Sequence, residues 1–373
     1  MNFPFNKLSI AFLVGTLRQG GAERQLFSIV RLLRQQGSRV KVFTFGEGEY
    51  WESHLEERGA QVFHVGMNGR RLSRLARLVF LLKADRPSLI QSLHFYTNLY
   101  ASVAGRLVGL PEVGAMRNDA QWSMDSLGGI LGKASLQVPR VLACNSQAAL
   151  ATCLAMRGHA RTCYLPNLVD LEEFVPAARP RKKSEFLILG VGNFRKEKRF
   201  DRFIETVFRV SQKSGISVRA ELIGDGFLRD DLEARAKRLG LHGNVIRFRG
   251  RVNELRSFYQ AADLLLLTSD FEGTPNVVLE AMACGIPVVS TDAGGLGEML
   301  ERGRCGYVSK TGDPDALAEL VCTLIRDREK WAQCGQEGRA AVERNHSENA
   351  VLKGLAELYS RVLPQGWSEQ MDS

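Results

Sequence analysis

Short apolar segments alternate with amphipathic helical patterns along almost the whole chain of 373 residues. Residues 8–14 form an apolar segment, and from residue 22 onward apolar side chains recur at helical spacing, as in Leu26, Ile29, Val30 and Leu33. Further strand candidates follow at 40–45, 61–65, 88–93, 113–116 and 141–144, with helical patterns such as 72–83 and 97–108 between them. This alternation predicts parallel sheets that are covered by helices on both faces.

The segment 175–183, which is rich in proline and charge, interrupts this alternation and is predicted to be a linker. The alternation restarts after it, with strand candidates at 186–191, 218–223, 245–248, 264–268 and 288–290. We therefore predict an α/β fold with two Rossmann-like domains in series, 1–178 and 184–349. Ligands of such folds bind outside the carboxyl ends of the strands, so we expect a ligand in a cleft between the two domains.

Composition disfavours several classes of protein. No apolar run approaches the roughly 18 residues that a membrane-spanning helix needs. The seven cysteines contain no C-x-x-C pair and the six histidines contain no H-x-x-x-H pair, so neither a disulfide framework nor a metal site is expected. We expect a soluble protein of the reducing cytoplasm.

The formal net charge of +9 is concentrated in the first half of the chain. Residues 1–180 carry 21 Lys and Arg against 13 Asp and Glu, whereas the remainder is almost balanced. A basic half suggests an anionic partner such as a membrane surface, an acidic acceptor or nucleic acid, although a plain solvated surface has the same composition. Aromatic residues are not interleaved with the basic ones as stacking platforms would be, so nucleic acid is not an expected partner.

The segment 70–83 places four arginines on a predicted amphipathic helix. Its apolar stripe is expected to pack against the first sheet, and it consists of Leu72, Leu75, Val79 and Leu82. Beside and opposite that stripe lie Arg70, Arg71, Arg74 and Arg77, which would be attracted to an anionic bilayer. We therefore expect reversible, peripheral attachment to the inner face of a membrane in addition to the ordinary packing role of this helix.

Three segments place glycine between a strand and a helix: 15–24, 190–198 and 269–276. Glycine lets backbone N–H groups approach a ligand closely, and a helix N-terminus favours a phosphate. None of the three matches the dinucleotide-binding or the P-loop pattern, which disfavours nicotinamide enzymes and nucleoside-triphosphate hydrolases. Together they indicate a different phosphorylated ligand.

The most specific pattern is EGTPNVVLE, which runs from Glu272 to Glu280. Glu272 lies in a glycine loop, whereas Glu280 lies in an apolar helical segment. A carboxylate in an apolar segment usually has a polar partner or binds a ligand hydroxyl.

With this E-x7-E motif the chain resembles the retaining, nucleotide-sugar-dependent glycosyltransferases of family 4, which have the two-domain GT-B fold. The likeness covers nearly the whole chain and is strongest from 186 to 308. It also includes IGDG at 223–226, FRGR at 248–251, GYV at 306–308, GGAER at 20–24, His94, NS at 145–146 and PNLVD at 166–170. The resemblance implies two domains facing across a cleft, with a C-terminal helix at about 350–373 that packs back on the first domain.

The resemblance further implies a hexosyltransferase that moves a hexosyl or N-acetylhexosaminyl group from a nucleotide diphosphate sugar, most often a UDP-sugar. The acceptor would be a glycan or a lipid-linked molecule in the synthesis of a cell-surface polysaccharide. By this resemblance the catalytic residues would be Glu272, His94 and Lys198. The residues that would bind the donor are Gly20, Gly21, Gly192, Asn193, Arg195, Lys198, Gly224, Gly250, Arg251, Gly273, Asn276, Val277, Val278 and Glu280.

Within that set, Glu280 would bind the ribose hydroxyls, Glu272 the donor sugar and Lys198 the diphosphate. The family usually has an arginine where this chain has Asn193, and Arg195 is a candidate for the second cation. Arg117 and Glu23 would face the acceptor. No metal or other cofactor is expected, because cationic side chains and helix N-termini would stabilise the departing diphosphate.

Asp313-Pro314-Asp315 is similar to a D-x-D metal motif, but an Asp cap followed by Pro at the first helical position predicts a helix start.

Two alternative functions stay open. They are a nucleotide-sugar epimerase of the same architecture and a transferase for a soluble small-molecule acceptor.

Overall fold

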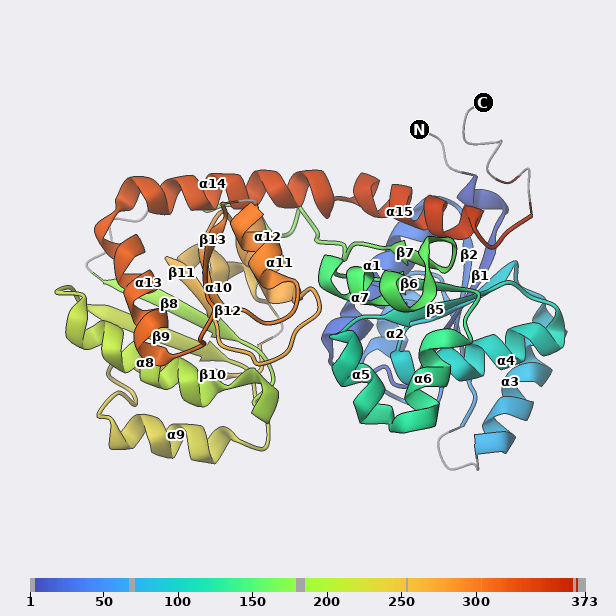
Figure 1. Cartoon of the computed structure of the whole chain (residues 1–373), viewed down its shortest axis with the longest axis horizontal. Coiled ribbons are helices and arrows are strands. Elements are labelled where there is room, and N and C mark those ends of the chain that lie inside the picture. The colour runs from blue at the N-terminus through green and yellow to red at the C-terminus, as the bar shows by residue number, and fades with distance from the viewer. Residues whose placement is uncertain are drawn as a thin grey trace. The chain divides into compact units, whose positions relative to one another are not determined.

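The computed structural model describes residues 4–66, 71–178, 185–252, 254–302, 304–364 and 367 (Figure 1). The chain forms two compact units. Unit 1 comprises residues 1–168 together with 348–373, and unit 2 comprises residues 169–347. The boundary between the units falls at 168/169, ahead of the proline-rich segment, of which residues 179–184 lie outside the described part.

Unit 1 contains a seven-stranded parallel sheet in the order β3-β2-β1-β4-β5-β6-β7. Its strands are β1 (Ser9–Val14), β2 (Arg39–Thr44), β3 (Gln61–His64), β4 (Leu89–Ser92), β5 (Glu112–Met116), β6 (Val141–Cys144) and β7 (Thr162–Tyr164). The strand order reverses between β1 and β4, which pair directly although they are not consecutive. Such a switch point is where α/β sheets bind ligands.

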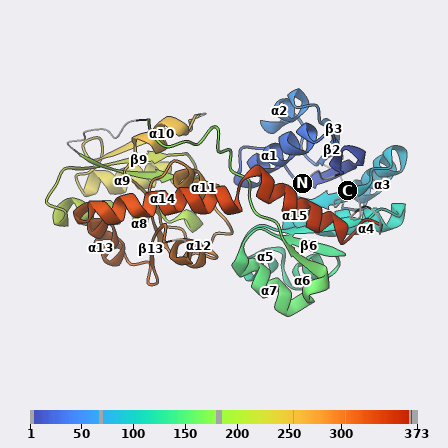
Figure 2. The same cartoon turned by 90° about the horizontal axis from the view of Figure 1, so that it is seen from above.

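Two layers of helices cover this sheet. The first layer contains α1 (Gly21–Gln35), α2 (Trp51–Glu57) and α15 (Glu348–Ser360), and it buries β-strand residues such as Ile10 and Phe12. The second layer contains α3 (Arg71–Asp85), α4 (Asn98–Val108), α5 (Ala120–Leu127), α6 (Gly129–Gln137) and α7 (Gln147–Arg157). Figure 1 shows α3, α4, α5 and α6 on the side of unit 1 away from α15, and Figure 2 shows α15 lying over the strands.

Unit 2 contains a six-stranded parallel sheet in the order β10-β9-β8-β11-β12-β13. Its strands are β8 (Phe186–Val191), β9 (Val218–Ile223), β10 (Ile246–Gly250), β11 (Leu264–Leu267), β12 (Val288–Thr291) and β13 (Gly306–Ser309). The order reverses between β8 and β11. Its helices are α8 (Phe200–Lys213), α9 (Arg229–Arg238), α10 (Arg256–Ala261), α11 (Asn276–Ala283), α12 (Leu296–Arg302), α13 (Pro314–Arg326) and α14 (Arg328–Asn345). The α/β prediction with two Rossmann-like domains is confirmed.

The interpretation of residues 313–315 as a helix start is confirmed. The Asp313 carboxylate accepts hydrogen bonds from the N–H groups of Asp315 and Ala316, and Pro314 is the first residue of α13. The short carboxylate side chain satisfies donors that have no partner within the helix, which is why this sequence begins a helix.

The predicted packing of residues 70–83 is partly wrong. The buried side chains of α3 are Leu78 and Leu82, whereas Leu72 is 79% exposed. At 100° per residue Leu72 lies well away from the direction of Leu78 and Leu82, so it does not reach the core. Arg74 also faces the protein, since its guanidinium lies over the Phe45 ring at 5.3 Å. Arg70 lies outside the described residues. No helix in the described ranges is long and apolar enough to cross a membrane.

Candidate active site

Three loops meet at the carboxyl edge of the unit 2 sheet, after β8, β9 and β10. The N–H of Gly192 donates to the carbonyl of Ile223 (2.9 Å), and the N–H of Gly224 donates to the carbonyl of Gly250 (2.8 Å). A Cβ on Gly224 would lie 1.9 Å from the Gly192 carbonyl oxygen, and Gly224 has φ of 138°. Only glycine fits there, so the backbones of these loops pack directly against each other at the sheet edge.

Glu272 lies in the loop after β11 and is buried, with 8% of its surface exposed. Its Oε1 accepts hydrogen bonds from Lys198 Nζ (2.6 Å) and Ser269 Oγ (2.7 Å). Its Oε2 makes no hydrogen bond to any described residue. A buried carboxylate therefore has one oxygen fixed by the protein and the other available to a hydroxyl donor.

Lys198 reaches Glu272 because β8 and β11 are neighbours. It ends the short 3-10 turn Lys196–Lys198 that follows β8, and Thr268 Oγ1 donates to the Lys198 and Arg199 carbonyls (3.2 and 2.9 Å). The Asp270 N–H donates to the Glu197 carbonyl (2.8 Å). The loops after the two strands are thus bound to each other through backbone contacts, which fixes the position of the Lys198–Glu272 pair.

Glu280 lies on α11, eight residues after Glu272, and is 3% exposed. Its Oε2 accepts a hydrogen bond from the phenol of Tyr259 on α10 (2.9 Å). Asn276, Val277 and Val278 form the first turn of the same helix after Pro275, where N–H groups are oriented toward the helix N-terminus. One helix therefore carries both an anion-favouring end and a buried carboxylate.

The backbone of Glu272 is also approached by the loop that follows β12. A Cβ on Gly294 would lie 2.0 Å from the Glu272 carbonyl oxygen, and Gly294 has a left-handed backbone with φ of 64°. Gly273 lies beside this contact in sequence. In the loop after β8, Asn193 is half-buried and Arg195 is exposed, and Arg251 after β10 is exposed as well. Arg195 makes no ion pair with any described residue, so its guanidinium is available to a phosphate.

In unit 1 the residues predicted to be functional also lie at the carboxyl ends of strands. His94 follows β4, and its Nδ1 accepts a hydrogen bond from the N–H of Gly15, which follows β1 (3.2 Å). The proton must then lie on Nε2, which donates to Glu23 Oε1 on α1 (3.1 Å). Gly20 caps α1 and Gly21 begins it. The structure thus brings Gly20, Gly21, Glu23 and His94 together at the point where the strand order reverses.

Arg117 follows β5 in the same sheet. Its Nη2 donates to Asn167 Oδ1 (2.7 Å), which also accepts from Asn145 Nδ2 (3.3 Å). Burial lowers the pKa of Arg117 to about 10, while the charge of Glu23 acts in the opposite direction. Arg117 stays protonated at neutral pH, so unit 1 holds a half-buried cation near the buried carboxylate of Glu23.

Two residues of the site, Tyr259 and Tyr96, were not predicted from the sequence. The Tyr96 ring stacks on His94 with centroids 5.1 Å apart, and burial followed by the charges of Glu23 and Glu49 raises the pKa of Tyr96 to about 12. Gly15 and Ser269 begin two of the predicted glycine segments, but the sequence assigned no individual role to them. Tyr259 and Tyr96 carry no sequence signal, since their partners depend on packing.

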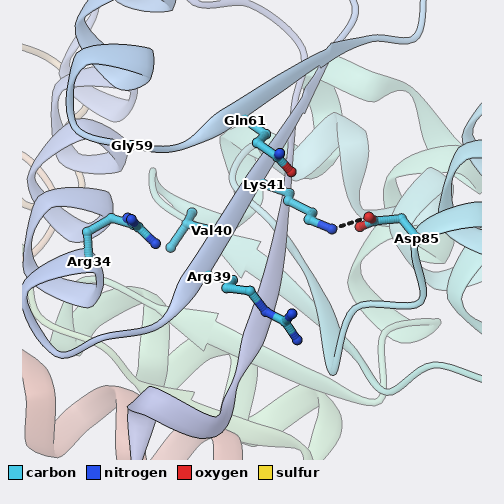
Figure 3. A pocket seen from close by; sticks show the side chains of 7 residues that line it. All are labelled: Arg34, Arg39, Val40, Lys41, Gly59, Gln61 and Asp85. Carbon is cyan, nitrogen blue, oxygen red and sulfur yellow. Dashed lines mark hydrogen bonds and ion pairs between the residues drawn. The ribbon is translucent and has the colours of Figure 1, made fainter.

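A surface pocket of about 490 Å³ lies at the opposite, amino edge of the unit 1 sheet (Figure 3). Its lining includes Arg34, Arg39 and Lys41, and Lys41 pairs with Asp85. Arg34 is in the last turn of α1 and donates to the Ser38 carbonyl (2.8 Å). A cation at a helix C-terminus complements the partial negative charge there, so Arg34 and the paired Lys41 are explained without a ligand.

The described residues contain no group of three or more His, Cys, Asp or Glu side chains that could hold a metal ion. Each of the seven cysteines is a buried free thiol. Burial raises the pKa of thiols such as Cys284 and Cys305 to about 12, so they are protonated and unreactive at neutral pH.

Comparisons with known proteins agree with this geometry. The family model for "Glycosyl transferases group 1" matches residues 172–341, and the model for "Glycosyl transferase 4-like domain" matches residues 20–169. The N-acetyl-alpha-D-glucosaminyl L-malate synthase of Bacillus anthracis is 28% identical over 181 residues, which is 48% of this chain and 47% of that protein. The lipopolysaccharide core biosynthesis glycosyltransferase LpsE of Rhizobium meliloti is 30% identical over 172 residues, which is 46% and 49%.

The chain thus spans about half the length of the curated relatives that it matches. Among solved structures, Anabaena Alr3699/HepE in complex with UDP and glucose superimposes with a TM-score of 0.81 at 24% identity, over 95% of this chain and 100% of that chain. TarM of S. aureus, in complex with Fondaparinux, alpha-GlcNAc-glycerol and UDP, gives a TM-score of 0.79 at 13% identity, over 94% and 99%. At these identities the structures establish the fold alone.

Proposed function

Because this chain belongs to the group 1, family 4-like glycosyltransferases, we propose that it transfers a hexosyl or N-acetylhexosaminyl group from a nucleotide diphosphate sugar to a glycan or a lipid-linked acceptor. The observation that carries the proposal is the pair of buried carboxylates Glu272 and Glu280, which Lys198 and Tyr259 hold in place. Glu272 lies in a loop whose backbone Gly294 approaches closely.

Unit 2 is the proposed donor-binding unit. Glu272 Oε2 accepts a hydroxyl of the donor sugar, and Glu280 accepts the ribose hydroxyls. Lys198 has three N–H donors, so it can keep its hydrogen bond to Glu272 and bind the diphosphate with another. Arg195 and the first turn of α11 add positive potential for the same diphosphate, while Gly192, Asn193, Gly224 and Gly273 leave space for the ligand. Gly250 and Arg251 contact the base.

The chemistry proposed for these residues is charge stabilisation of the leaving group. As the bond from sugar to diphosphate breaks, negative charge grows on the phosphate oxygens, and Lys198 with the α11 N-terminus is fixed in advance to meet it. The Glu272 contact to the sugar orients the donor for attack from the same face, so the product retains the anomeric configuration. Side-chain cations replace a metal ion in this scheme.

Unit 1 is the proposed acceptor-binding unit. Its Gly20 and Gly21 amides and the His94 Nε2–H contribute donors to the phosphate and the sugar, and Glu23 and Arg117 meet the acceptor. The Nε2–H of His94 donates to Glu23 Oε1. This hydrogen bond must therefore be shared or broken when His94 donates to the substrate. The nucleotide is proposed to be UDP, because the similar HepE and TarM structures are complexes with UDP. The site of action is proposed to be the cytoplasm.

Thermal shift with a panel of nucleotide sugars tests the donor assignment, because a ligand that binds only the folded state raises its apparent stability. UDP-sugars are expected to raise the melting temperature and GDP- or ADP-sugars to leave it unchanged. The bound donor is then incubated with glycan and lipid-linked acceptors in EDTA. Transfer in EDTA with retained configuration by NMR supports the mechanism, whereas inversion, or loss that magnesium restores, contradicts it. Conversion of the donor without any acceptor would identify an epimerase instead.

A further inference from the structure

Large apolar side chains are exposed on only one of the two helix layers of unit 1. The layer of α3 to α7 exposes Leu72, Phe80, Val103, Leu107, Trp122, Ile130, Leu131 and Met156. The described helices α1, α2 and α15 of the opposite layer expose none, and Tyr50 lies just before α2. Exposed apolar residues are common singly, but their restriction to one layer indicates a surface that is covered in function.

The same layer is the basic one. Helices α3 to α7 contain seven Lys or Arg against two acidic residues, whereas α1, α2 and α15 contain four against six. The excess of positive charge in residues 1–180 is therefore not spread evenly around unit 1. It lies on the layer that also exposes the apolar side chains.

Helix α3 shows the two features on one surface. Phe80 is 65% exposed and points away from the buried Leu78 and Leu82, because each of them is two residues from it, or about 200° around the helix. Arg77 and Lys83 are exposed beside it, each about 60° from Phe80 around the helix, and neither forms an ion pair with a described residue. A helix that buries one face in its own protein still presents a second face of apolar and cationic side chains. We call Leu72, Phe80, Arg77 and Lys83 the α3 outer face.

The composition of the α3 outer face favours a lipid surface over nucleic acid as its partner. Nucleic acid would need aromatic rings interleaved with the cations over a groove, whereas Phe80 is the only aromatic residue of α3. A lipid interface accepts protruding Leu and Phe side chains into its acyl boundary while Lys and Arg contact anionic headgroups. The neighbouring helix α4 adds Val103, Leu107 and the exposed Arg106, so the pattern extends beyond one helix.

We propose that the layer of α3 to α7, with the α3 outer face at its centre, binds reversibly to an anionic lipid bilayer. The proposal deepens the proposed function, since it places unit 1 where a lipid-linked acceptor would be reached. In this arrangement Leu72 and Phe80 enter the interface, Arg77 and Lys83 contact headgroups, and Arg74 takes no part because it lies over Phe45.

Flotation of the full chain with phosphatidylcholine vesicles, with and without roughly one third phosphatidylglycerol, tests the proposal. Recovery is expected on the anionic vesicles at low salt and is expected to fall as ionic strength rises. Two variants separate the apolar and the charged contributions: Leu72→Ser with Phe80→Ser, and Arg77→Gln with Lys83→Gln. Each is expected to lower the partition coefficient by about tenfold or more.

Matched controls change the same chemistry elsewhere. Ile216→Ser removes an exposed apolar side chain of unit 2, and Lys237→Gln with Arg238→Gln removes two exposed cations outside the proposed surface. Both controls are expected to bind vesicles like the original chain. Circular dichroism and the thermal shift with nucleotide sugar show that every variant is folded and still binds donor.

The outcomes distinguish this inference from the proposed function. Equal recovery on neutral and anionic vesicles, or equal recovery of the variants and the original chain, overturns the membrane proposal while donor binding stands. A dimer in solution that Phe80→Ser dissociates overturns it as well, because a second copy of the chain would then cover this face. Loss of donor binding in the original chain contradicts the proposed function and leaves the vesicle result unaffected.

Discussion

The two units build their candidate sites at the same place in the fold but from differently distributed residues. In unit 2 both buried carboxylates and Ser269 lie within one stretch, from Ser269 to Glu280, and their partners Lys198 and Tyr259 come from elsewhere. In unit 1 the residues come from three separate segments, since Gly15 and Glu23 follow β1, His94 follows β4 and Arg117 follows β5. A contiguous motif is visible in a sequence, whereas a site assembled from distant strand ends is not.

The units also differ in how their buried charges are balanced. Glu272 is paired with a lysine and a serine, and Glu280 with a phenol, so each carboxylate of unit 2 has its own partner. In unit 1 the single carboxylate Glu23 hydrogen-bonds His94 and also acts on Arg117 and Tyr96. We therefore expect substitutions in unit 2 to act on separate steps of donor binding, and a substitution of Glu23 to affect several residues at once.

The largest effect is expected from Lys198→Ala. The change leaves Glu272 buried without its cation and removes the proposed contact to the diphosphate, which together cost about 2–4 kcal/mol, or roughly 30- to 1,000-fold in transfer rate. The rate is measured at subsaturating donor. Lys213→Ala is the matched control, because Lys213 pairs with Glu319 on the exposed surface of the same unit. A rate within twofold of the original chain would refute the role of Lys198.

An intermediate effect is expected at Glu280. Glu280→Ala removes the proposed ribose acceptor and should abolish most transfer, and Tyr259→Phe should weaken donor affinity less, because it removes one hydrogen bond worth about 1–2 kcal/mol. Isothermal titration with the nucleotide sugar measures the affinity. Tyr359→Phe is the matched control, since Tyr359 donates to Gln91 in the core of unit 1 (2.8 Å). Equal losses of donor affinity in both phenylalanine variants would show that general destabilisation is the cause.

The smallest effect is expected from Glu23→Gln. The amide oxygen can still accept the hydrogen bond from His94 Nε2, but the charge that faces Arg117 is lost, so we expect turnover to fall by about tenfold or less with donor affinity unchanged. Glu23→Ala also removes the acceptor and should cost more. Steady-state kinetics with varied donor and varied acceptor separate the two substrates. A change in donor affinity alone would place Glu23 with the donor rather than the acceptor.

Features with a local physical cause could be predicted from the sequence. The strand–helix alternation and the helix start at Asp313 each depend on residues within one or two turns, and the structure confirms both. The roles of Glu272 and Glu280 in the E-x7-E motif stay a prediction. The glycine loops were also found, because a close backbone approach such as that of Gly224 to Gly192 leaves glycine in the sequence. The identity of the approaching partner was not visible.

The sequence could not predict which side chains of a helix face the core where that choice depends on neighbouring elements. Residues 72–82 of α3 contain more apolar positions than one face can bury, so periodicity alone allowed several stripes. Packing against α4 and the sheet buries Leu78 and Leu82 and leaves Leu72 and Phe80 exposed. The same contacts turned Arg74 inward over Phe45.

The sequence by itself determined the elements of this protein and their type, because hydrophobic period, capping residues and glycine act over short distances. Only the tertiary structure decided which polar groups form hydrogen bonds with each other across the chain. Lys198 and Glu272 are 74 residues apart, and Gly15 and His94 are 79 apart. Each pair forms because the strand order places β8 beside β11 and β1 beside β4. That order results from the packing of all the strands and helices at once, so no segment of the chain contains it.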